Sequence, residues 1–307
     1  MRALLVTNPK ATSTTPRVRD VILGALSRDL DLQIAHTDRR GHAIELGAQA
    51  RRDGFDLVIA LGGDGTVNEL VNGILADGVN DDVPALAALP GGSANVFARA
   101  LGLGNDPVEA TGQVLEAVRE SRVRRIGLGQ VEGRWFVFSA GFGFDAQVVR
   151  DVELRRGDGR KATPYLYAST AVRGYLNRRK ANLPPMTIEL PDGTTVPDVF
   201  LTVVTHTTPW TYYGKRAVHV TPQASYDHGL DVFALRPLGA LRVGRILWQV
   251  TRKVANPRGG RVRVLHDLHD FKITAAGPLP LQVDGDYAGD HAAVHFRNVA
   301  GALRVIA

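Results

Sequence analysis

The sequence contains no cysteine, which excludes disulfide bonds, thiolate metal sites and a cysteine nucleophile. It also has no apolar run approaching the roughly 20 residues that a helix needs to span a bilayer. The first residues, MRALLVTNP, hold only a short apolar run before a polar turn, so we expect a first strand there and not a signal peptide. These absences predict a cytoplasmic protein whose contact with a membrane is peripheral.

Acidic residues are missing between Val232 and His266, a stretch that is rich in arginine. A second basic cluster, interleaved with tyrosines, comes earlier in the chain, and the formal net charge is +6. Such a distribution suits an anionic membrane surface, nucleic acid or a solvated face. The aromatic and basic residues match no RNA- or DNA-binding module, so we expect no nucleic-acid partner. The two clusters are Arg236, Arg242, Arg245, Arg252, Lys253, Arg258, Arg261 and Arg263, and Arg155, Arg156, Arg160, Lys161, Arg173, Arg178, Arg179 and Lys180.

The first part of the chain alternates between buried-type strands and amphipathic helices. Four strands are expected before residue 100, each followed by a helical pattern, and this alternation predicts an open, Rossmann-like α/β sheet over residues 1–123. In such a sheet, ligands bind at the carboxyl ends of the strands. The expected strands are Ala3 to Thr7, Leu32 to His36, Leu57 to Leu61 and Pro84 to Leu89.

After Val123 the pattern changes to short strands separated by Pro, Gly and Asp turns. This pattern predicts a mainly antiparallel β-sandwich domain over residues 124–296. Two helices are expected within it, Tyr165 to Arg179 and Gly239 to Val254. Residues 297–307 could belong either to this domain or, by a return of the chain, to the first domain.

One stretch has the form of a phosphate cradle. The apolar run Leu57 to Leu61 ends at Gly62-Gly63-Asp64-Gly65-Thr66, and a helical pattern follows. Glycines between a strand and a helix let main-chain N–H groups approach an anion. A carboxylate at the centre would repel a bare phosphate, so we expect Asp64 to lie beside a cation, a protonated partner or a hydroxyl that loses its proton. The alternative is a tight turn with an Asp cap.

Two further turns are expected at the same edge of the sheet. They are the polar segment from Asn8 to Ser13 and the second glycine turn, Pro90 to Asn95. Together with the first glycine turn they could surround a polyphosphate, with Lys10 supplying positive charge and threonine and serine supplying hydroxyl donors. The sequence has no G-x-x-x-x-G-K-[ST] motif, so it is not a P-loop NTPase. Three ordinary turns are the alternative.

Two acidic turns could serve catalysis or a metal. Asp284-Gly285-Asp286 follows an expected strand, and its carboxylates could bind Mg²⁺ or act as a general base toward a hydroxyl. Asp227-His228-Gly229-Leu230-Asp231 offers oxygen ligands suited to a hard cation. An ordinary hairpin turn is the alternative for both.

Two other patterns are weaker. Gly141 to Ala146 has the form of a dinucleotide fingerprint, but the rest of a mononucleotide-binding half is missing, so we interpret it as a tight turn against the active-site edge. His266, His269, His291 and His295 have spacings that could ligate zinc, but no Glu or Cys completes a recognised pattern.

Taken in order, these motifs resemble the bacterial diacylglycerol kinase catalytic-domain family, which also contains sphingosine and ceramide kinases. The glycine-aspartate loop alone is shared with NAD kinases, and the later motifs favour the lipid kinases. The resemblance covers nearly the whole chain. It rests on Asn8-Pro9, LGGDGTVNE (Leu61 to Glu69), LPGGSANVFAR (Leu89 to Arg99), AGFGFDA (Ala140 to Ala146), DHGLD (Asp227 to Asp231) and VDGD (Val283 to Asp286).

The resemblance implies ATP-dependent phosphorylation of a lipid hydroxyl, in a two-domain fold with the active site in the interdomain cleft. It implies Asp286 as proton acceptor, with Asp284 beside it near the metal and phosphates. Either of the two could be the base, and Asp64 is a third catalytic candidate. Asp227 would hold Mg²⁺ with main-chain carbonyls near Ala224 and Gly229. The residues that would bind ATP are Asn8, Pro9, Lys10, Ala11, Thr12, Thr37, Gly62, Gly63, Asp64, Gly65, Thr66, Val67, Asn68 and Ser93.

Three positions depart from the family pattern. Val96 replaces an Asp, Ser93 replaces a Thr, and Asp286 replaces a Glu that is one methylene longer. The acceptor that the resemblance favours is diacylglycerol, at an anionic membrane surface. The alternatives are a sphingoid or ceramide kinase, an NAD kinase-like enzyme, and a catalytically silent lipid-binding regulator suggested by Val96. The sequence leaves open a homodimer.

Overall fold

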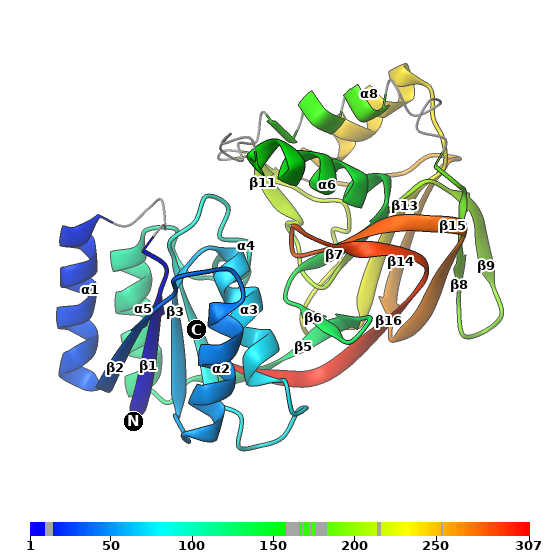
Figure 1. Ribbon diagram of the computed structural model, residues 1–307. Helices are drawn as coiled ribbons and strands as arrows, with labels where there is room; N and C mark the ends of the chain where they lie inside the picture. Colours follow the sequence, from blue (N-terminus) through cyan, green and yellow to red (C-terminus); the bar gives the residue numbers. More distant parts are fainter. Residues whose placement is uncertain are drawn as a thin grey trace. The chain divides into compact units, whose positions relative to one another are not determined.

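The computed structural model describes residues 1–9, 15–157, 166–167, 169–171, 173–175, 183–213, 216–252 and 254–307. Contacts divide the chain into two compact units, which we call unit 1 and unit 2 (Figure 1). Unit 1 comprises Met1–Leu128 and Ala300–Ala307, and unit 2 comprises Gly129–Val299. The first crossing between them lies inside strand β5 (Val123–Val131), whereas the composition of the sequence placed a boundary near Val123.

Unit 1 is built on a parallel sheet in the order β2-β1-β3-β4. The last part of β16 (Asp286–Ile306) joins it, since Val305 pairs in parallel with Leu86. Strands β3 and β4 are buried along their whole length, which explains their unbroken apolar sequences. The strands are β1 (Arg2–Thr7), β2 (Asp31–His36), β3 (Leu57–Gly62) and β4 (Ala85–Pro90).

Helices cover both faces of this sheet (Figure 1). Helices α1 and α5 pack together, as do α2 and α3. Thr15 caps α1 by accepting the Val18 N–H at 3.3 Å, and Pro16 takes the first helical position, where a missing N–H costs nothing. The helices are α1 (Pro16–Asp29), α2 (His42–Arg52), α3 (Asp64–Ile74), α4 (Val96–Ala100) and α5 (Pro107–Arg119).

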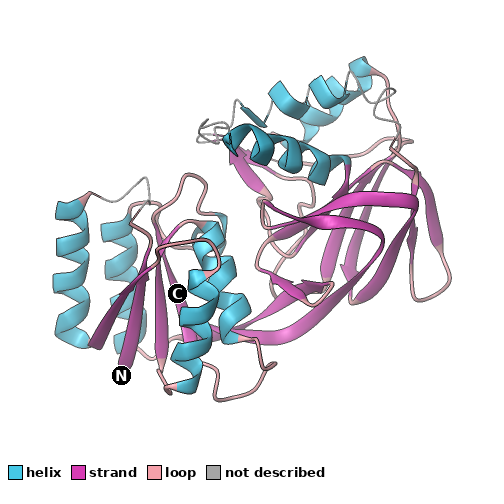
Figure 2. Cartoon of the chain, viewed as in Figure 1, coloured by secondary structure: helices cyan, strands magenta, loops and turns pink. Residues whose placement is uncertain are grey.

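Unit 2 is dominated by antiparallel strands (Figure 2). Its main path runs β14-β13-β10-β7-β15-β16. The elements are β6 (Arg134–Phe136), β7 (Ser139–Gly143), α6 (Phe144–Gly157), β8 (Met186–Glu189), β9 (Thr195–Val199), β10 (Leu201–Thr205), β11 (Thr211–Tyr213), β12 (Arg216–Val218), β13 (Leu230–Leu235), α8 (Ala240–Val250), β14 (Val262–Leu268), β15 (Asp270–Val283) and β16.

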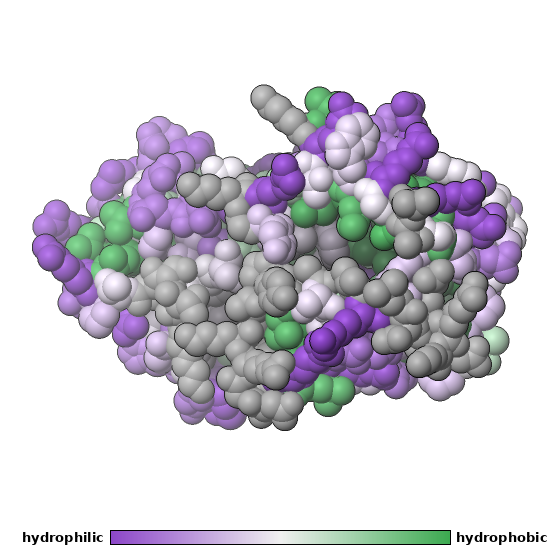
Figure 3. Space-filling model, turned by 90° about the horizontal axis from the view of Figure 1, so that it is seen from above, coloured by the Kyte–Doolittle hydropathy of each residue, from purple (hydrophilic) through white to green (hydrophobic). Residues whose placement is uncertain are grey.

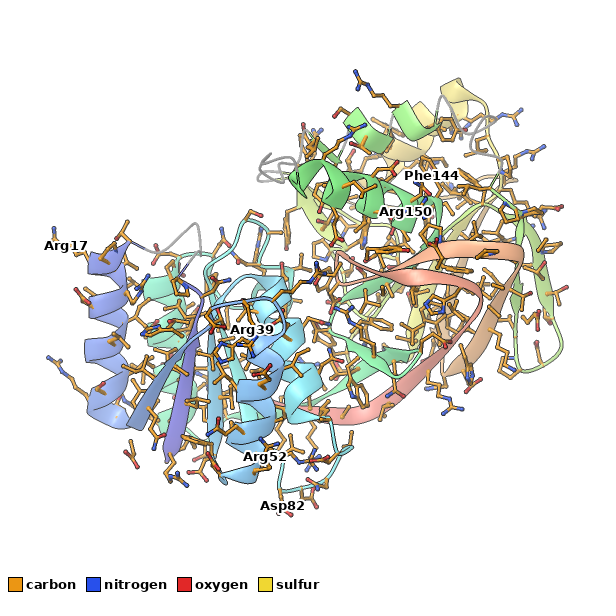
Figure 4. All side chains as sticks on the ribbon, in the orientation of Figure 1. Arg17, Arg39, Arg52, Asp82, Phe144 and Arg150 are labelled. Atoms are coloured by element: carbon orange, nitrogen blue, oxygen red, sulfur yellow. The ribbon has the colours of Figure 1, made fainter. Side chains whose placement is uncertain are left out.

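Two apolar clusters fill unit 2. One lies among the strands around Phe136, Phe271 and Phe296. The other joins the strands to α6 and α8 and contains Phe144 and Val250. Figure 4 shows Phe144 at the start of α6 and Arg150 further along that helix. The predicted fold class, an α/β unit followed by a mainly antiparallel one, is confirmed.

Several predicted elements need correction. From the turn residues Gly277 and Pro278, the sequence predicts two short strands, Phe271 to Ala275 and Leu279 to Val283. They form one strand, β15, with an irregular register between Thr274 and Leu279. Helix α8 begins at Ala240 and ends at Val250, shorter than predicted. The helix predicted from Tyr165 to Arg179 lies partly outside the described residues, and those described between 166 and 175 are helical.

Candidate functional site

The polar turns of unit 1 gather at one edge of its sheet. Neighbouring strands β2, β1, β3 and β4 are parallel, so their carboxyl ends lie side by side. Asn8 follows β1 and donates its N–H to the Leu61 oxygen at 3.2 Å, while Thr37 follows β2 and donates to Thr7 at 2.9 Å. Pro9 comes next to Asn8, and Lys10, Ala11 and Thr12 lie outside the described residues. The structure therefore brings together the predicted turns of unit 1 that it describes.

The two glycine turns touch through their main chains. The Gly91 N–H donates to the Gly62 oxygen at 2.8 Å. A Cβ built on Gly91 would lie 2.9 Å from the Gly62 Cα, and one on Gly92 would lie 2.7 Å from the Gly63 Cα. Real Cβ atoms essentially never come so close to main-chain carbon, so this approach requires glycine at positions 91 and 92 of the second turn.

Asn95 closes the second glycine turn and was not among the site residues predicted from the sequence. Its main chain is left-handed, with φ 51°. The Gly92 N–H donates to Asn95 Oδ1 at 2.8 Å, and Asn95 Nδ2 donates to the Gly92 oxygen at 3.0 Å. Asparagine tolerates this conformation better than most residues, and an Asn soon after Gly-Gly was the available signal.

Asp64 links the first glycine turn to helix α4. Its Oδ1 accepts the Phe97 N–H at 3.1 Å, at the positive end of that helix. Burial raises the pKa of Asp64, against the lowering effect of the main-chain N–H groups of Phe97, Val96 and Asn95. Main-chain donors thus meet this carboxylate, as the alternative of an Asp cap predicted. A cation or a hydroxyl beside Asp64 stays a prediction.

The remaining predicted ATP-binding residues differ in exposure. Gly65 and Ser93 are exposed, whereas Thr66, Val67 and Asn68 are buried. The Thr66 and Val67 N–H groups both donate to the Gly63 oxygen, which starts helix α3.

Glu69, at the end of the same motif, has a structural role that sequence reasoning missed. Its carboxylate accepts the N–H of Gly41 at 2.8 Å and of Ala43 at 3.2 Å. Helix α2 has no side-chain cap at Gly41, so Glu69 supplies one from the neighbouring helix. No local sequence signal connects these residues, which are 28 positions apart.

In unit 2, Asp284 and Gly285 form the two-residue turn of the hairpin between β15 and β16. Both have positive φ, 48° and 85°, as a type I′ turn requires. The Asp284 carboxylate is buried and accepts three main-chain N–H groups, from Val137 at 2.7 Å, Phe138 at 3.0 Å and Ser139 at 2.9 Å. Asp284 therefore anchors the turn to the residues before β7.

Asp286 is the first residue of β16 and is placed differently. Its side chain is 25% exposed, and Oδ2 lies 3.7 Å from Arg134 Nη2. Of the two carboxylates, Asp286 is thus the more accessible to a reacting group. Because unit 1 and unit 2 are described separately, the interdomain cleft stays a prediction.

The turn around Asp227 brings carboxylate and main-chain oxygen atoms together within a short stretch of the chain. Asp227 is exposed, its Oδ2 lies 3.4 Å from Ser225 Oγ, and Ala224 and Gly229 lie close by in the chain. One carboxylate with main-chain carbonyls suits a hard cation such as Mg²⁺.

A zinc site is not supported. His266 Nδ1 lies 2.7 Å from Asp231 Oδ1, and His295 Nε2 lies 2.7 Å from Asp270 Oδ1, so each has a carboxylate of its own. Across the described part of the chain, His, Asp and Glu form no group of three that could hold a metal ion.

The segment Gly141 to Ala146 is not the tight turn that we predicted. Strand β7 continues to Gly143, and helix α6 begins at Phe144. The glycine at 143 has φ 84°, and a Cβ there would lie 2.6 Å from Met186 Cε and 2.9 Å from the Phe200 oxygen. Strand pairing with β10 and β15, which local sequence does not show, extends the strand this far.

Comparisons with known proteins agree with this architecture. Residues 2–131 match the model of the diacylglycerol kinase catalytic domain. The Bacillus subtilis protein named "Diacylglycerol kinase" is 30% identical over 258 residues, which cover 81% of this chain and 77% of that protein. The Chromohalobacter salexigens protein named "Probable lipid kinase YegS-like" is 37% identical over 144 residues, covering 47% of this chain and 44% of that protein. The matched region thus spans less than half of the latter relative.

A crystal structure of a diacylglycerol kinase from Bacillus anthracis str. Sterne has a TM-score of 0.73 to this chain. It is 21% identical and the match covers 99% of this chain and 96% of that one, so it shows a common fold.

The class to which these relatives belong is the lipid kinases, phosphotransferases with an alcohol group as acceptor. Within that class, the chain belongs to the diacylglycerol kinase family. Membership of a kinase family implies the use of ATP.

Proposed function

We propose that the protein transfers the γ-phosphoryl group of Mg-ATP to a lipid hydroxyl, with diacylglycerol as the favoured acceptor. The observation that best supports this function is the main-chain contact between the two glycine turns of unit 1. It leaves exposed backbone and hydroxyl groups at the carboxyl edge of a parallel sheet, in a chain of the diacylglycerol kinase family.

The groups that would bind the nucleotide come from several strand ends. The start of α3 presents main-chain N–H groups and the positive end of a helix, and a Cβ-free Gly65 leaves open space there. Exposed Ser93 adds a hydroxyl from the second glycine turn, and Thr37 adds one from the end of β2. In this proposal the bulk of catalysis is positioning and charge stabilisation, as in other phosphoryl transfers.

Asp286 would act as the general base. A base needs an accessible oxygen, and both oxygens of Asp284 accept main-chain N–H groups. The lipid hydroxyl gives its proton to Asp286, its oxygen bonds to the γ-phosphorus, and the bond to the β–γ bridging oxygen breaks to release ADP. Because Asp is shorter than Glu, the lipid hydroxyl must come closer to the strand, or a water must relay the proton.

Asp227 would hold a Mg²⁺ ion together with the main-chain carbonyls of Ala224 and Gly229. The donors are all oxygen atoms, which is the set that this ion prefers. When bound, the ion supplies positive charge that fixes this turn.

The lipid would be reached from an anionic membrane surface. Helix α8 buries Ile246, Gln249 and Val250 in unit 2 and leaves a mixed basic and apolar face outside. On that face Trp248 is 58% exposed and Leu247 is 57% exposed. Arginines accompany them on and beside the helix, namely Arg242, Arg245 and Arg252, and Arg252 lies 4.4 Å from the centre of the Trp248 ring.

Two further features of the described chain are consistent with peripheral contact with a membrane. In the described part of the chain no helix is long and apolar enough to cross a membrane. On the coloured part of the face in Figure 3, apolar residues occur in small groups among hydrophilic ones. Peripheral contact that combines charge with a few inserted apolar side chains suits such a surface.

A panel of lipid hydroxyls in mixed micelles, with labelled ATP, tests the proposal. We expect labelled phosphate on diacylglycerol, or on a sphingoid base or ceramide if that is the acceptor. A parallel reaction with NAD and no lipid separates an NAD kinase-like enzyme. Transfer to none of the lipids would contradict the proposal.

A catalytically silent lipid-binding protein is the second candidate, and Val96 favours it. This side chain is buried at the start of α4, where the family pattern has a carboxylate. This second candidate function predicts vesicle binding without phosphate transfer, and a gain of phosphate transfer in Val96→Asp.

A further inference from the structure

The hairpin turn that carries Asp286 is held from a second side, by Gln282. This residue is 2% exposed and lies on β15, one residue before the end of the strand. The Gly285 N–H donates to Gln282 Oε1 at 2.8 Å. The two residues before Asp286 therefore have separate anchors: the Asp284 carboxylate on the residues before β7, and the Gly285 N–H on Gln282.

The other end of the Gln282 amide contacts Asp145. Gln282 Nε2 donates to Asp145 Oδ2 at 2.9 Å. The orientation of the amide is fixed chemically, because a main-chain N–H can only donate and so requires the amide oxygen, which leaves the NH₂ group for the carboxylate. Asp145, Gln282 and Gly285 thus form one directional chain of hydrogen bonds.

The strand next to this pair is shaped to leave room for it. Gly141 on β7 is paired with Gln282 on β15. A Cβ on Gly141 would lie 2.0 Å from Asp145 Oδ2 and 2.8 Å from Gln282 Nε2. The space that a side chain at 141 would fill is therefore occupied by the carboxylate and the amide.

Keeping the Asp145 carboxylate in this buried place costs desolvation energy, which an apolar side chain would not cost. Desolvation raises the pKa of Asp145 to about 6, and the hydrogen bond from Gln282 lowers it. A carboxylate kept in such a place is either structural or positions another group. The contact from Gln282 to the turn of Asp286 favours the second.

We propose that Asp145 is a positioning residue for the reaction: acting through Gln282, it fixes the main chain at Gly285 and so the place of the Asp286 carboxylate. This inference rests on the proposed function, in which Asp286 is the base. Asp145 itself touches neither the proposed base nor a substrate in this account.

Exchanging the donor and the acceptor gives the sharpest test. Gln282→Glu sets two carboxylates against each other at pH 8, so the turn should shift and kcat should fall about tenfold or more, with KM for ATP within about twofold. Adding Asp145→Asn restores one hydrogen bond with the roles reversed, since the introduced amide NH₂ donates to the introduced carboxylate at position 282. The double variant should recover most of the lost kcat.

Gln113→Glu is the matched control. Gln113 on α5 of unit 1 also accepts a main-chain N–H, from Gly104 at 2.8 Å, and should tolerate the same amide-to-carboxylate change without loss of kcat. If Gln282→Glu does not fold, Gln282→Met removes both hydrogen bonds without adding charge and should lower kcat alike.

Hydrogen exchange separates this inference from the proposed function. The Gly285 amide should exchange faster in Gln282→Glu and return toward the wild-type rate in the double variant, whether or not any lipid is phosphorylated. An inactive wild-type protein would contradict the proposed function alone. The positioning role would be overturned if the exchange rate of the Gly285 amide were the same in all these variants. It would also be overturned if a folded double variant were no more active than Gln282→Glu.

Discussion

Single glycines decide how closely the two turns of unit 1 approach. We expect Gly92→Ala to destabilise unit 1 by about 1–3 kcal/mol, because its Cβ would have to displace the main chain at Gly63. ATP affinity should fall with it. Thermal unfolding and equilibrium binding of ATP measure the two effects.

Gly112→Ala provides the control for that prediction. A Cβ at Gly112 meets nothing within 4 Å, and the residue lies inside helix α5. Alanine there should stabilise the helix by about 0.5–1 kcal/mol and leave ATP binding unchanged. Equal losses in both variants would show that the contact between the turns is not what matters.

Asp145 should make stability depend on pH. Its pKa is raised from 3.8 to about 6 in the folded chain, so the folded state holds this proton more tightly than the unfolded state. Stability is therefore lost as pH rises through the window from about 4 to about 6, by at most about 3 kcal/mol. Asp145→Asn should raise Tm at pH 8 and have little effect below pH 4. A variant equally stabilised at both pH values would contradict this account.

At the scale of elements, α8 is the segment that we expect to meet a membrane. Arg245→Glu combined with Arg252→Glu should lower binding to phosphatidylglycerol vesicles about tenfold or more, since each basic residue near an anionic surface contributes about 1 kcal/mol. Trp248→Ala should weaken binding through lost apolar contact. Cosedimentation with vesicles at low salt measures both.

The control for α8 is an equal charge change elsewhere. Arg52 is exposed at the end of α2 in unit 1 (Figure 4), and Arg52→Glu should leave vesicle binding nearly unchanged. Binding of the wild-type protein to phosphatidylcholine vesicles as strongly as to anionic ones would argue against a charged docking face.

Elements were predicted best where local sequence determines them. Strands β3 and β4 are buried along their length, and their apolar runs show it. Strand β15 was divided in two because Gly277-Pro278 is typical of a turn, whereas the structure accommodates it as an irregularity in the pairing with β16. The partner of Asp64 could not be predicted for a similar reason, since Phe97 is 33 residues away.

At the scale of the whole molecule, sequence order predicted the two-part fold and which turns meet in unit 1, because parallel strands share a carboxyl edge. It could not separate Asp284 from Asp286, because the N–H groups that bind Asp284 come from residues 137–139, far away in the sequence. Nor could it predict the chain from Asp145 to Gly285, which depends on the register of β7 against β15.

The central claim is that Asp286 accepts the proton of a lipid hydroxyl while ATP is held by unit 1. Transfer of labelled phosphate from ATP to diacylglycerol by the wild-type protein and by Asp286→Asn tests it most directly. We predict transfer by the wild type and a fall in kcat of about 100-fold or more in the variant, with KM for ATP nearly unchanged. Undiminished transfer by a folded Asp286→Asn protein would contradict the claim.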